Sequence, residues 1–91
     1  MTKTAYELCE GFYNYLKDSG RKSSTLSEYA KRQRIKNKLY PSKFETVSSA
    51  ELKVIRTALS SGHNIFPKLK LYSYKKSANN TGVEAIYRLT E

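Results

Sequence analysis

Helix start signals fix the beginnings of two helices in this 91-residue chain and so limit the folds open to it. A capping box, in which a hydroxyl residue is followed three positions later by Glu, occurs at Thr25 with Glu28 and at Ser48 with Glu51. In a capping box the two side chains satisfy free backbone N–H groups of the first helical turn. We therefore expect one helix to begin near Ser24 and another at Ser48.

Helix-breaking residues mark the ends of three predicted helices. Gly20 and Gly62 are placed to end helices in the left-handed conformation that glycine adopts most easily. Pro41 stops the middle segment, because the residue before a proline avoids helical backbone angles. The three predicted helices cover residues 4–18, 24–40 and 48–61.

Apolar residues recur at helical spacing in these segments. The predicted buried stripes contain Ala5, Leu8, Cys9, Phe12, Tyr15 and Leu16 in the first helix, and Leu52, Ile55, Ala58 and Leu59 in the third. The second helix is less regular, because Ile35 and Leu39 project almost opposite to the face of Tyr29. We expect this helix to bend after Gln33 or to pack its far end on a different element.

The last thirty residues fit two structures. The segments KLKLYSYKK and VEAIYRL can alternate between polar and apolar residues, and the turn-like ANNTG lies between them, as in a β-hairpin. However, Val83, Ile86 and Leu89 can also line one face of a helix. The fold is therefore either mainly α-helical with four helices, or a winged helix with a C-terminal β-hairpin over residues 68–90.

The length and composition of the chain indicate one small domain. The chain has 91 residues, 38% of them hydrophobic, which is enough for one core and leaves no room for a second. No apolar run approaches the ~20 residues of a membrane span. The N-terminal segment lacks the apolar core of a signal peptide, so we expect a cytoplasmic protein.

Residues for catalysis or metal binding are scarce. Cys9 is the one cysteine and His63 the one histidine, which excludes an internal disulfide and a zinc cluster. The sequence has no glycine-rich phosphate loop, no His-x-x-x-His pair and no clustered carboxylates. We therefore predict a protein that is not an enzyme and uses no metal or other cofactor.

Positive charge is large and unevenly placed. The net charge is +9, and residues 17–43 hold nine Lys or Arg against two acids, while residues 63–76 hold four Lys and no acid. Charge concentrated in this way favours a polyanionic partner and speeds encounter with it. A solubilising surface is the alternative explanation.

The basic second helix is the predicted contact with nucleic acid. On a helical wheel, Lys31, Arg34 and Lys38 fall on one flank of its apolar face. Arg32 and Lys36 fall on the other flank. Two basic flanks can touch phosphates on both sides of a groove while the helix lies in or across it. Hydroxyls at the helix start and lysines nearer the C-terminus extend this surface, and the full predicted set is Ser23, Ser24, Lys31, Arg32, Arg34, Lys36, Lys38, Lys68, Lys70, Lys75 and Lys76.

The eight tyrosines suggest a base-stacking platform as one interpretation. Core packing explains most of them better, because Tyr15 and Tyr29 lie on predicted core-facing stripes. Tyr72 and Tyr74, which lie among lysines, are the pair for which exposure would favour stacking.

The segment FYNYLKDSGRKSSTLSEYAKR resembles the N-terminal core-binding domain of tyrosine recombinases and phage integrases. In that family a first helix ends in Tyr-Leu before a Gly, and a Thr and a Tyr follow the Gly at fixed offsets. Gly20, Thr25 and Tyr29 sit at those offsets here. The later segment SANNTGVEAIYRL is similar, more loosely, to the family's final helix, which implies a helix over residues 78–90.

The resemblance implies a mainly α-helical, four-helix fold that forms a single DNA-binding domain over residues 1–91. In the family this domain clamps one face of duplex DNA, and a separate C-terminal domain, absent here, carries out catalysis. The chain departs from the family pattern at Lys22, where a capping serine is usual, and at Gln33, where an apolar residue is usual. It would be an excised or naturally separate DNA-binding domain, or a phage or mobile-element protein that uses the fold for another task.

Two functions follow as hypotheses. The leading one is a non-catalytic domain that contacts the backbone and major groove of duplex DNA through the basic second helix. The alternative is a small phage or mobile-element regulator or inhibitor that acts by protein contact on a recombinase, a nuclease or another nucleic-acid enzyme, or on a ribonucleoprotein. In that case the basic face would bind an acidic patch or a guide RNA. Neither hypothesis involves a membrane partner.

Overall fold

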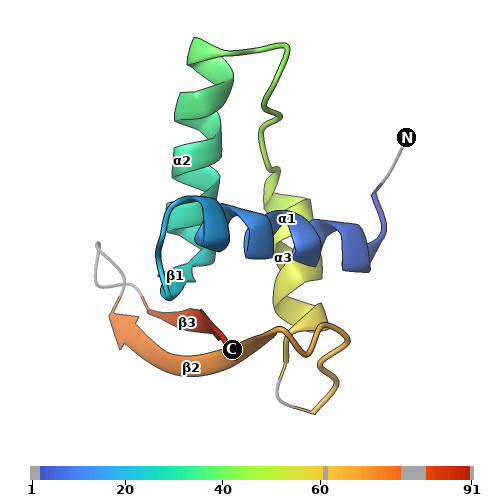
Figure 1. The fold of residues 1–91 in the computed structure, drawn as a ribbon. Coiled ribbons are helices and arrows are strands. Elements are labelled where there is room, and N and C mark those ends of the chain that lie inside the picture. Colours follow the sequence, from blue (N-terminus) through green and yellow to red (C-terminus); the bar gives the residue numbers. More distant parts are fainter. Residues whose placement is uncertain (1–2, 61, 77–81, 91) are drawn as a thin grey trace.

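The computed structural model describes residues 3–60, 62–76 and 82–90, which form three helices and one antiparallel three-stranded sheet (Figure 1). The elements follow one another as α1 (Ala5–Asp18), β1 (Ser23–Thr25), α2 (Leu26–Leu39), α3 (Ser49–Ala58), β2 (Leu69–Lys76) and β3 (Val83–Leu89). The strand order in the sheet is β1–β3–β2, so the short strand before α2 joins the C-terminal hairpin.

The mainly α-helical, four-helix fold that the integrase resemblance implied is wrong. Residues 83–89 form β3 and pair with β2 instead of forming a fourth helix, and residues 78–81 of that expected helix lie outside the described ranges. Burial explains why a strand forms here. Val83, on the supposed helical face, is 66% exposed, whereas Tyr87, off that face, is 2% exposed. The C-terminal β-hairpin of the alternative prediction is confirmed.

Capping fixes the helix starts largely as predicted. At Ser48 both halves of the box form, with Ser48 Oγ accepting from the Glu51 N–H at 3.2 Å and Glu51 Oε1 accepting from the Ser48 N–H at 3.0 Å. A further box, not predicted, begins α1 at Thr4. At Thr25 the hydroxyl accepts from the Glu28 N–H at 3.2 Å, and the Glu28 carboxylate binds arginines instead of completing the box.

The helix ends match the prediction at Gly20 and differ from it at Gly62. Gly20 follows α1 with φ of +70°, the left-handed region that glycine adopts without strain. In contrast, α3 ends at Ala58, several residues before Gly62, and the Leu59 N–H bonds to the Ile55 carbonyl at 3.0 Å. Leu59 is the C-cap residue, so Gly62 does not cap α3.

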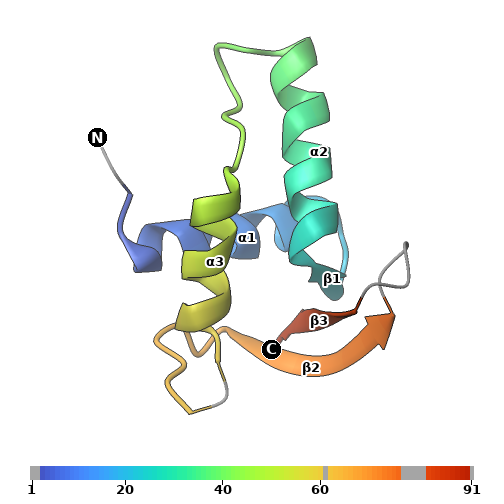
Figure 2. The ribbon, with the colours of Figure 1, turned by 180° about the vertical axis from the view of Figure 1, so that it is seen from behind.

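The three helices lie on one face of the sheet, and no described helix covers the other face (Figures 1 and 2). Helix α1 crosses α2 and α3 and packs most extensively on α3. The core lies between these layers and consists of Leu8, Cys9, Phe12, Tyr15, Leu16, Tyr29, Ile55, Ala58, Leu59, Phe66, Leu69 and Tyr87. The stripes predicted for the first and third helices supply most of this core, because their apolar residues repeat at helical spacing.

The far half of α2 extends beyond the rest of the molecule (Figure 1). Ile35 and Leu39 are 45% and 67% exposed, so these two apolar residues do not pack on another described element as expected. The segment that follows is held against α2 by side chains, with Asn37 Nδ2 donating to the Phe44 carbonyl at 2.6 Å. The exposed end of α2 is therefore available to a partner.

No helix in the described ranges has the length and apolar character needed to cross a membrane. The radius of gyration is 12.8 Å, which agrees with the value of about 13 Å expected for a compact chain of this size.

Candidate nucleic-acid interface

Three cations form a row along one side of α2. Lys31, Arg34 and Lys38 are three or four residues apart, which places their side chains one above another on the helix surface. All three are exposed, and none has an acidic partner among the residues that the structure describes. These residues, called the cationic row below, span about 10 Å of helix length at ~1.5 Å per residue.

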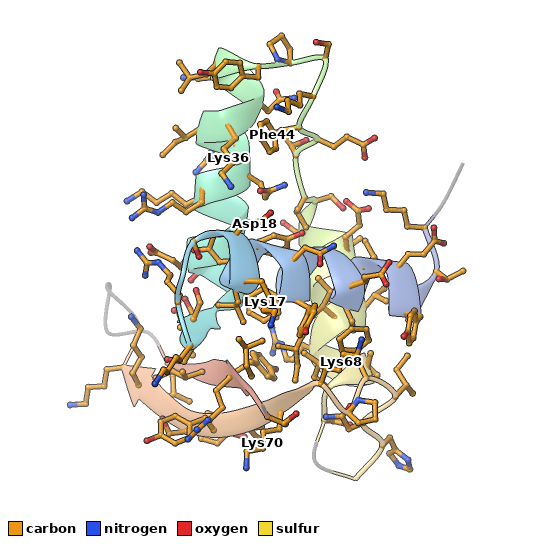
Figure 3. The ribbon with its side chains drawn as sticks, in the orientation of Figure 1. Lys17, Asp18, Lys36, Phe44, Lys68 and Lys70 are labelled. Atoms are coloured by element: carbon orange, nitrogen blue, oxygen red, sulfur yellow. The ribbon has the colours of Figure 1, made fainter. Side chains whose placement is uncertain are left out.

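The two cations of the opposite flank are engaged within the protein. Arg32 Nε lies 3.3 Å from Glu28 Oε1, and Arg21 lies 3.6 Å from the same oxygen. The Lys36 ammonium lies 5.2 Å from the ring centre of Phe44, beneath the top of α2 (Figure 3). The five basic residues predicted on this helix therefore divide into three free cations and two with partners.

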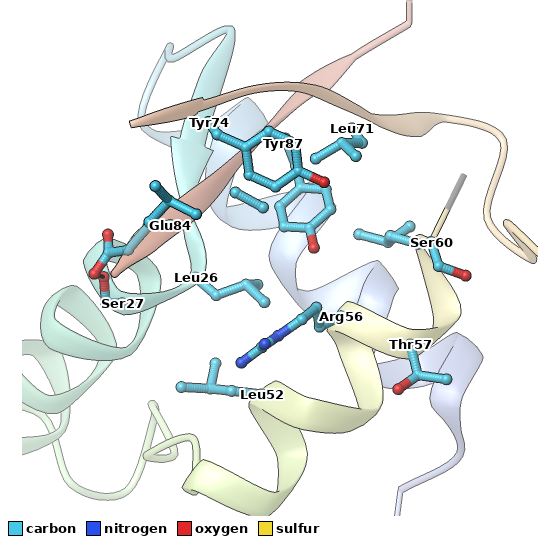
Figure 4. A pocket seen from close by; sticks show the side chains of 13 residues that line it. Leu26, Ser27, Leu52, Arg56, Thr57, Ser60, Leu71, Tyr74, Glu84 and Tyr87 are labelled. Atoms are coloured by element: carbon cyan, nitrogen blue, oxygen red, sulfur yellow. Dashed lines mark hydrogen bonds between the residues drawn. The ribbon is translucent and has the colours of Figure 1, made fainter. Parts of the chain in front are cut away.

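A groove of about 660 Å³ opens beside the base of α2 (Figure 4). It lies between α2, α3 and the inner face of the hairpin, and none of the described residues of α1 lines it. The groove therefore faces away from α1, which lies in the foreground of Figure 1. Leu26, Leu52 and Leu71 contribute to its apolar walls. Its volume falls in the range of about 300–1,000 Å³ that is typical of ligand sites.

Arg56 supplies positive charge inside the groove. Figure 4 shows its side chain extending from α3 toward Leu26 and Leu52. Arg56 has no ion pair within the described ranges. Burial raises the pKa of the neighbouring Tyr87 hydroxyl, and the positive charge of Arg56 opposes this rise. The groove thus combines apolar walls with an unpaired guanidinium.

Ser27 joins the groove to the cationic row. It lies four residues before Lys31 and therefore begins the same stripe on α2. Ser27 lines the groove, and its hydroxyl donates to Glu84 Oε1 at 2.9 Å. The cationic row consequently begins one helical turn from the edge of the groove.

The end of β2 carries two lysines, of which one lies beside the groove. Lys76 pairs with Val83, which lines the groove, and Lys75 pairs with Glu84. Both lysines are exposed. Figures 1 and 2 both show this end of β2 projecting on the side of the molecule where α2 stands. Adjacent residues of a strand point to opposite faces, so Lys76 shares the inner face of the hairpin with Tyr74, and Lys75 lies on the outer face. Arg56 lies in the groove, with the cationic row and Lys76 beside it, and Glu84 is the acid among the described lining residues.

The other predicted residues lie elsewhere. Ser24 is 7% exposed in β1, where its hydroxyl donates to the Thr25 carbonyl at 3.1 Å, so it cannot reach a phosphate. Ser23 is half-buried in the same strand. Lys68 lies 5.3 Å from the ring centre of Tyr13 in α1, and Lys70 projects from the sheet face opposite the helices (Figure 3). The predicted set is thus spread over three surfaces.

Two groove residues were not predicted as functional. Arg56 was not among the predicted residues, although its position four residues after Leu52 places it beside an apolar residue. Tyr74 was considered only as a stacking residue. Its place in the groove depends on the hairpin packing beside α3, which helical spacing does not reveal.

The described residues offer neither a metal-binding cluster nor an exposed thiol. No cluster of three His, Cys, Asp or Glu side chains suited to a metal ion is found among them. Burial raises the pKa of the Cys9 thiol to about 11, so this buried thiol stays protonated at neutral pH. The surface is suited to binding an anionic partner through charge and apolar contact.

Comparisons with protein-family models, curated proteins and solved structures give no match to this chain. The physical features of its surfaces are therefore the basis for a functional proposal.

Proposed function

We propose that this protein is a non-catalytic domain that binds duplex DNA along the cationic row and the adjoining groove. The observation that supports the proposal most strongly is the row itself, Lys31, Arg34 and Lys38. Three exposed cations without described acidic partners, aligned on a projecting helix, can release counterions from a phosphate backbone.

The arrangement around the groove supports contact with both sides of a duplex groove. The cationic row would follow one phosphate strand, and Lys76 at the hairpin end would reach the other. Arg56, between them, carries a planar guanidinium that suits bidentate binding of phosphate or a guanine edge.

The proposal rests on this surface and not on the integrase resemblance, whose implied four-helix fold is contradicted by the hairpin. It differs from the sequence-based prediction in the residues used. Arg56 is added, and the predicted residues left out are Ser23, Ser24, Arg32, Lys36, Lys68, Lys70 and Lys75. The cytoplasmic location expected from the sequence stays a prediction.

A salt titration tests the proposal. The full chain is added to a labelled random-sequence duplex of about 25 base pairs at several salt concentrations, and fluorescence anisotropy is followed. Neutralisation of about five phosphates predicts a slope of about −4.5 in log K against log salt, with affinity in the micromolar range. Absence of binding at low salt would overturn the proposal.

A second candidate function is supported by the exposed apolar residues at the free end of α2. Ile35 and Leu39 lie one turn apart and are 45% and 67% exposed, and cations flank them on both sides. The charged backbone of duplex DNA offers few apolar contacts to such residues. An acidic protein surface with an apolar contact would match them in charge and in polarity. A regulator or inhibitor of a nucleic-acid enzyme would use this end of α2.

The two candidates are separated by the double variant Ile35→Ser, Leu39→Ser. If duplex DNA is the partner, this variant should bind the duplex as well as the natural chain does, because all cations remain. If a protein is the partner, the natural chain should not bind DNA at low salt, and the variant should lose the protein complex.

A further inference from the structure

The outer face of the sheet presents an aromatic ring and two cations, away from the proposed duplex-binding surface. Tyr72 is 58% exposed, and the Arg88 guanidinium carbon lies 4.9 Å from the centre of its ring. Lys70 is the cross-strand neighbour of Arg88. Figure 3 shows Lys70 below the sheet, on the side away from the helices. An exposed aromatic ring therefore lies within a cationic surface.

A β-bulge puts Tyr72 and Tyr74 on opposite faces of the sheet. The residues on either side of it, Leu71 and Ser73, pair with adjacent residues of β3, so Tyr72 is an extra residue in β2. An extra residue changes the direction of the side chains that follow. Tyr74 accordingly lies on the inner face, where it lines the groove. In a regular strand the two tyrosines would share one face, because side chains alternate with a period of two.

We infer that this outer face binds an unpaired base of single-stranded nucleic acid by stacking on Tyr72. The Arg88 guanidinium lies over one face of the Tyr72 ring, and more than half of the Tyr72 side chain remains exposed to a base. Lys70 and the Arg88 guanidinium lie close enough to the ring to contact the phosphates that flank the base. Aromatic side chains combined with cations are the usual means of binding single strands without sequence preference.

The bases of a duplex are already stacked on one another and cannot use an isolated ring in this way. The inferred site therefore selects single-stranded regions, whereas the groove on the inner side of the sheet is proposed for duplex. The two sites lie on different faces, so this inference goes beyond the proposed function and each can fail without the other.

Two tyrosine variants of the full chain test the inference. The probe is a labelled oligothymidine of about 12 nucleotides containing one 2-aminopurine, within the range of single-strand site sizes. Tyr72→Ala should weaken binding about 5- to 150-fold, which is the range for loss of one base–aromatic stack. Tyr74→Ala is the matched control and should change the affinity less than about twofold, because its ring lies on the other face. Tyr72→Trp should retain binding and quench the 2-aminopurine fluorescence.

Several results would overturn the inference. These are the absence of oligothymidine binding at low salt, an equal loss of affinity in both alanine variants, or full affinity in Tyr72→Ala. Loss of oligothymidine binding on neutralising the cationic row alone would instead assign single strands to the groove. Because Tyr72 is exposed, Tyr72→Ala should unfold at the temperature of the natural chain, and a thermal melt confirms that a loss is not due to unfolding. A matching oligouridine shows whether the site distinguishes RNA from DNA.

Discussion

Tyr72 and Tyr74 are two residues apart in β2, yet their side chains lie on opposite faces of the sheet. The ring of Tyr72 contacts Arg88 on the open face, and Tyr74 lines the groove beside α3. Their exposures are 58% and 61%, so loss of either ring costs the fold a similar amount of packing. A difference in binding between the two alanine variants can therefore be assigned to one face of the sheet.

Neutralising the cationic row should weaken duplex binding selectively. The variant Lys31→Gln, Arg34→Gln, Lys38→Gln removes three charges from one side of α2, and the salt slope should become shallower by about 2.7 because three phosphate contacts are lost. Fluorescence anisotropy with the same duplex measures both the slope and the affinity.

The control for the row removes the same charge elsewhere. Lys17 and Lys68 lie near the Tyr13 ring, and Lys43 lies near Phe44 in the segment after α2. The variant Lys17→Gln, Lys43→Gln, Lys68→Gln has the same net charge as the row variant and should keep most of the slope. Equal losses in the two variants would show that net charge alone, and not the row, determines binding.

Tyr29→Ala should destabilise the domain by about 3 kcal/mol, enough to threaten a chain of this size. Tyr29 is 5% exposed, and its ring centre lies 5.1 Å from that of Phe12 and 5.2 Å from that of Tyr15. Urea unfolding followed by circular dichroism gives the free energy. Tyr40→Ala is the exposed control, since Tyr40 is 58% exposed, and it should cost less than about 1 kcal/mol. Similar costs for the two variants would contradict the core position of Tyr29.

Gly20→Ala should lower the free energy of unfolding by about 1 kcal/mol, because an alanine at φ of +70° is strained. A methyl group at Gly20 would meet no atom within 4 Å, so the cost comes from the backbone and not from a clash. Gly20→Asn should cost less, because asparagine adopts the left-handed conformation more readily than alanine. Thermal melts of the two variants make the comparison, and equal melting temperatures would argue against a left-handed Gly20.

Alkaline pH should destabilise the fold. Burial, helped by the negative charge of Glu51, raises the pKa of Tyr29 from 10.0 to about 12. The folded state therefore favours the protonated phenol. This contribution is complete below pH 10.0 and is lost as the pH rises to about 12. Ionisation of Cys9 also destabilises the fold as the pH rises from 9.0 to about 11, because burial raises the pKa of its thiol.

The variant Tyr29→Phe separates this effect from general alkaline unfolding. Without the Tyr29 hydroxyl, the loss of stability between pH 10.0 and about 12 should be smaller than in the natural chain. Denaturant unfolding at a series of pH values measures the loss, and the ultraviolet absorbance of tyrosinate shows when the buried hydroxyls ionise. Identical pH profiles for the two chains would exclude Tyr29 as the source.

Local signals predicted the first three helices because those signals act within one or two turns. The capping box at Ser48 and the glycine turn at Gly20 satisfy backbone groups a few residues away, so no distant contact is needed to recognise them. The apolar stripe through Phe12 and Leu16 likewise identified core residues from spacing alone. The same reasoning failed at Gly62, where a glycine near the end of a periodic segment proved not to be the cap.

The candidate site was only partly predictable. Helical spacing put Lys31, Arg34 and Lys38 on one flank, and the structure keeps them together and exposed. Glu28 lies four residues before Arg32, so helical spacing could have predicted their ion pair, although the prediction did not use it. Spacing gave no sign that Lys36 would lie against Phe44, which comes from the segment after α2. Whether a cation is free depends on which groups the chain brings to it from elsewhere.

The sequence by itself determined the positive charge, the helix boundaries set by caps and the apolar stripes, since these depend on residue type and on neighbours in the chain. The tertiary structure decided between helix and strand for residues 83–89, because both patterns fit locally and only burial of Tyr87 against the core selects the strand. It also decided the faces of Tyr72 and Tyr74, because a bulge in β2 arises from pairing with β3.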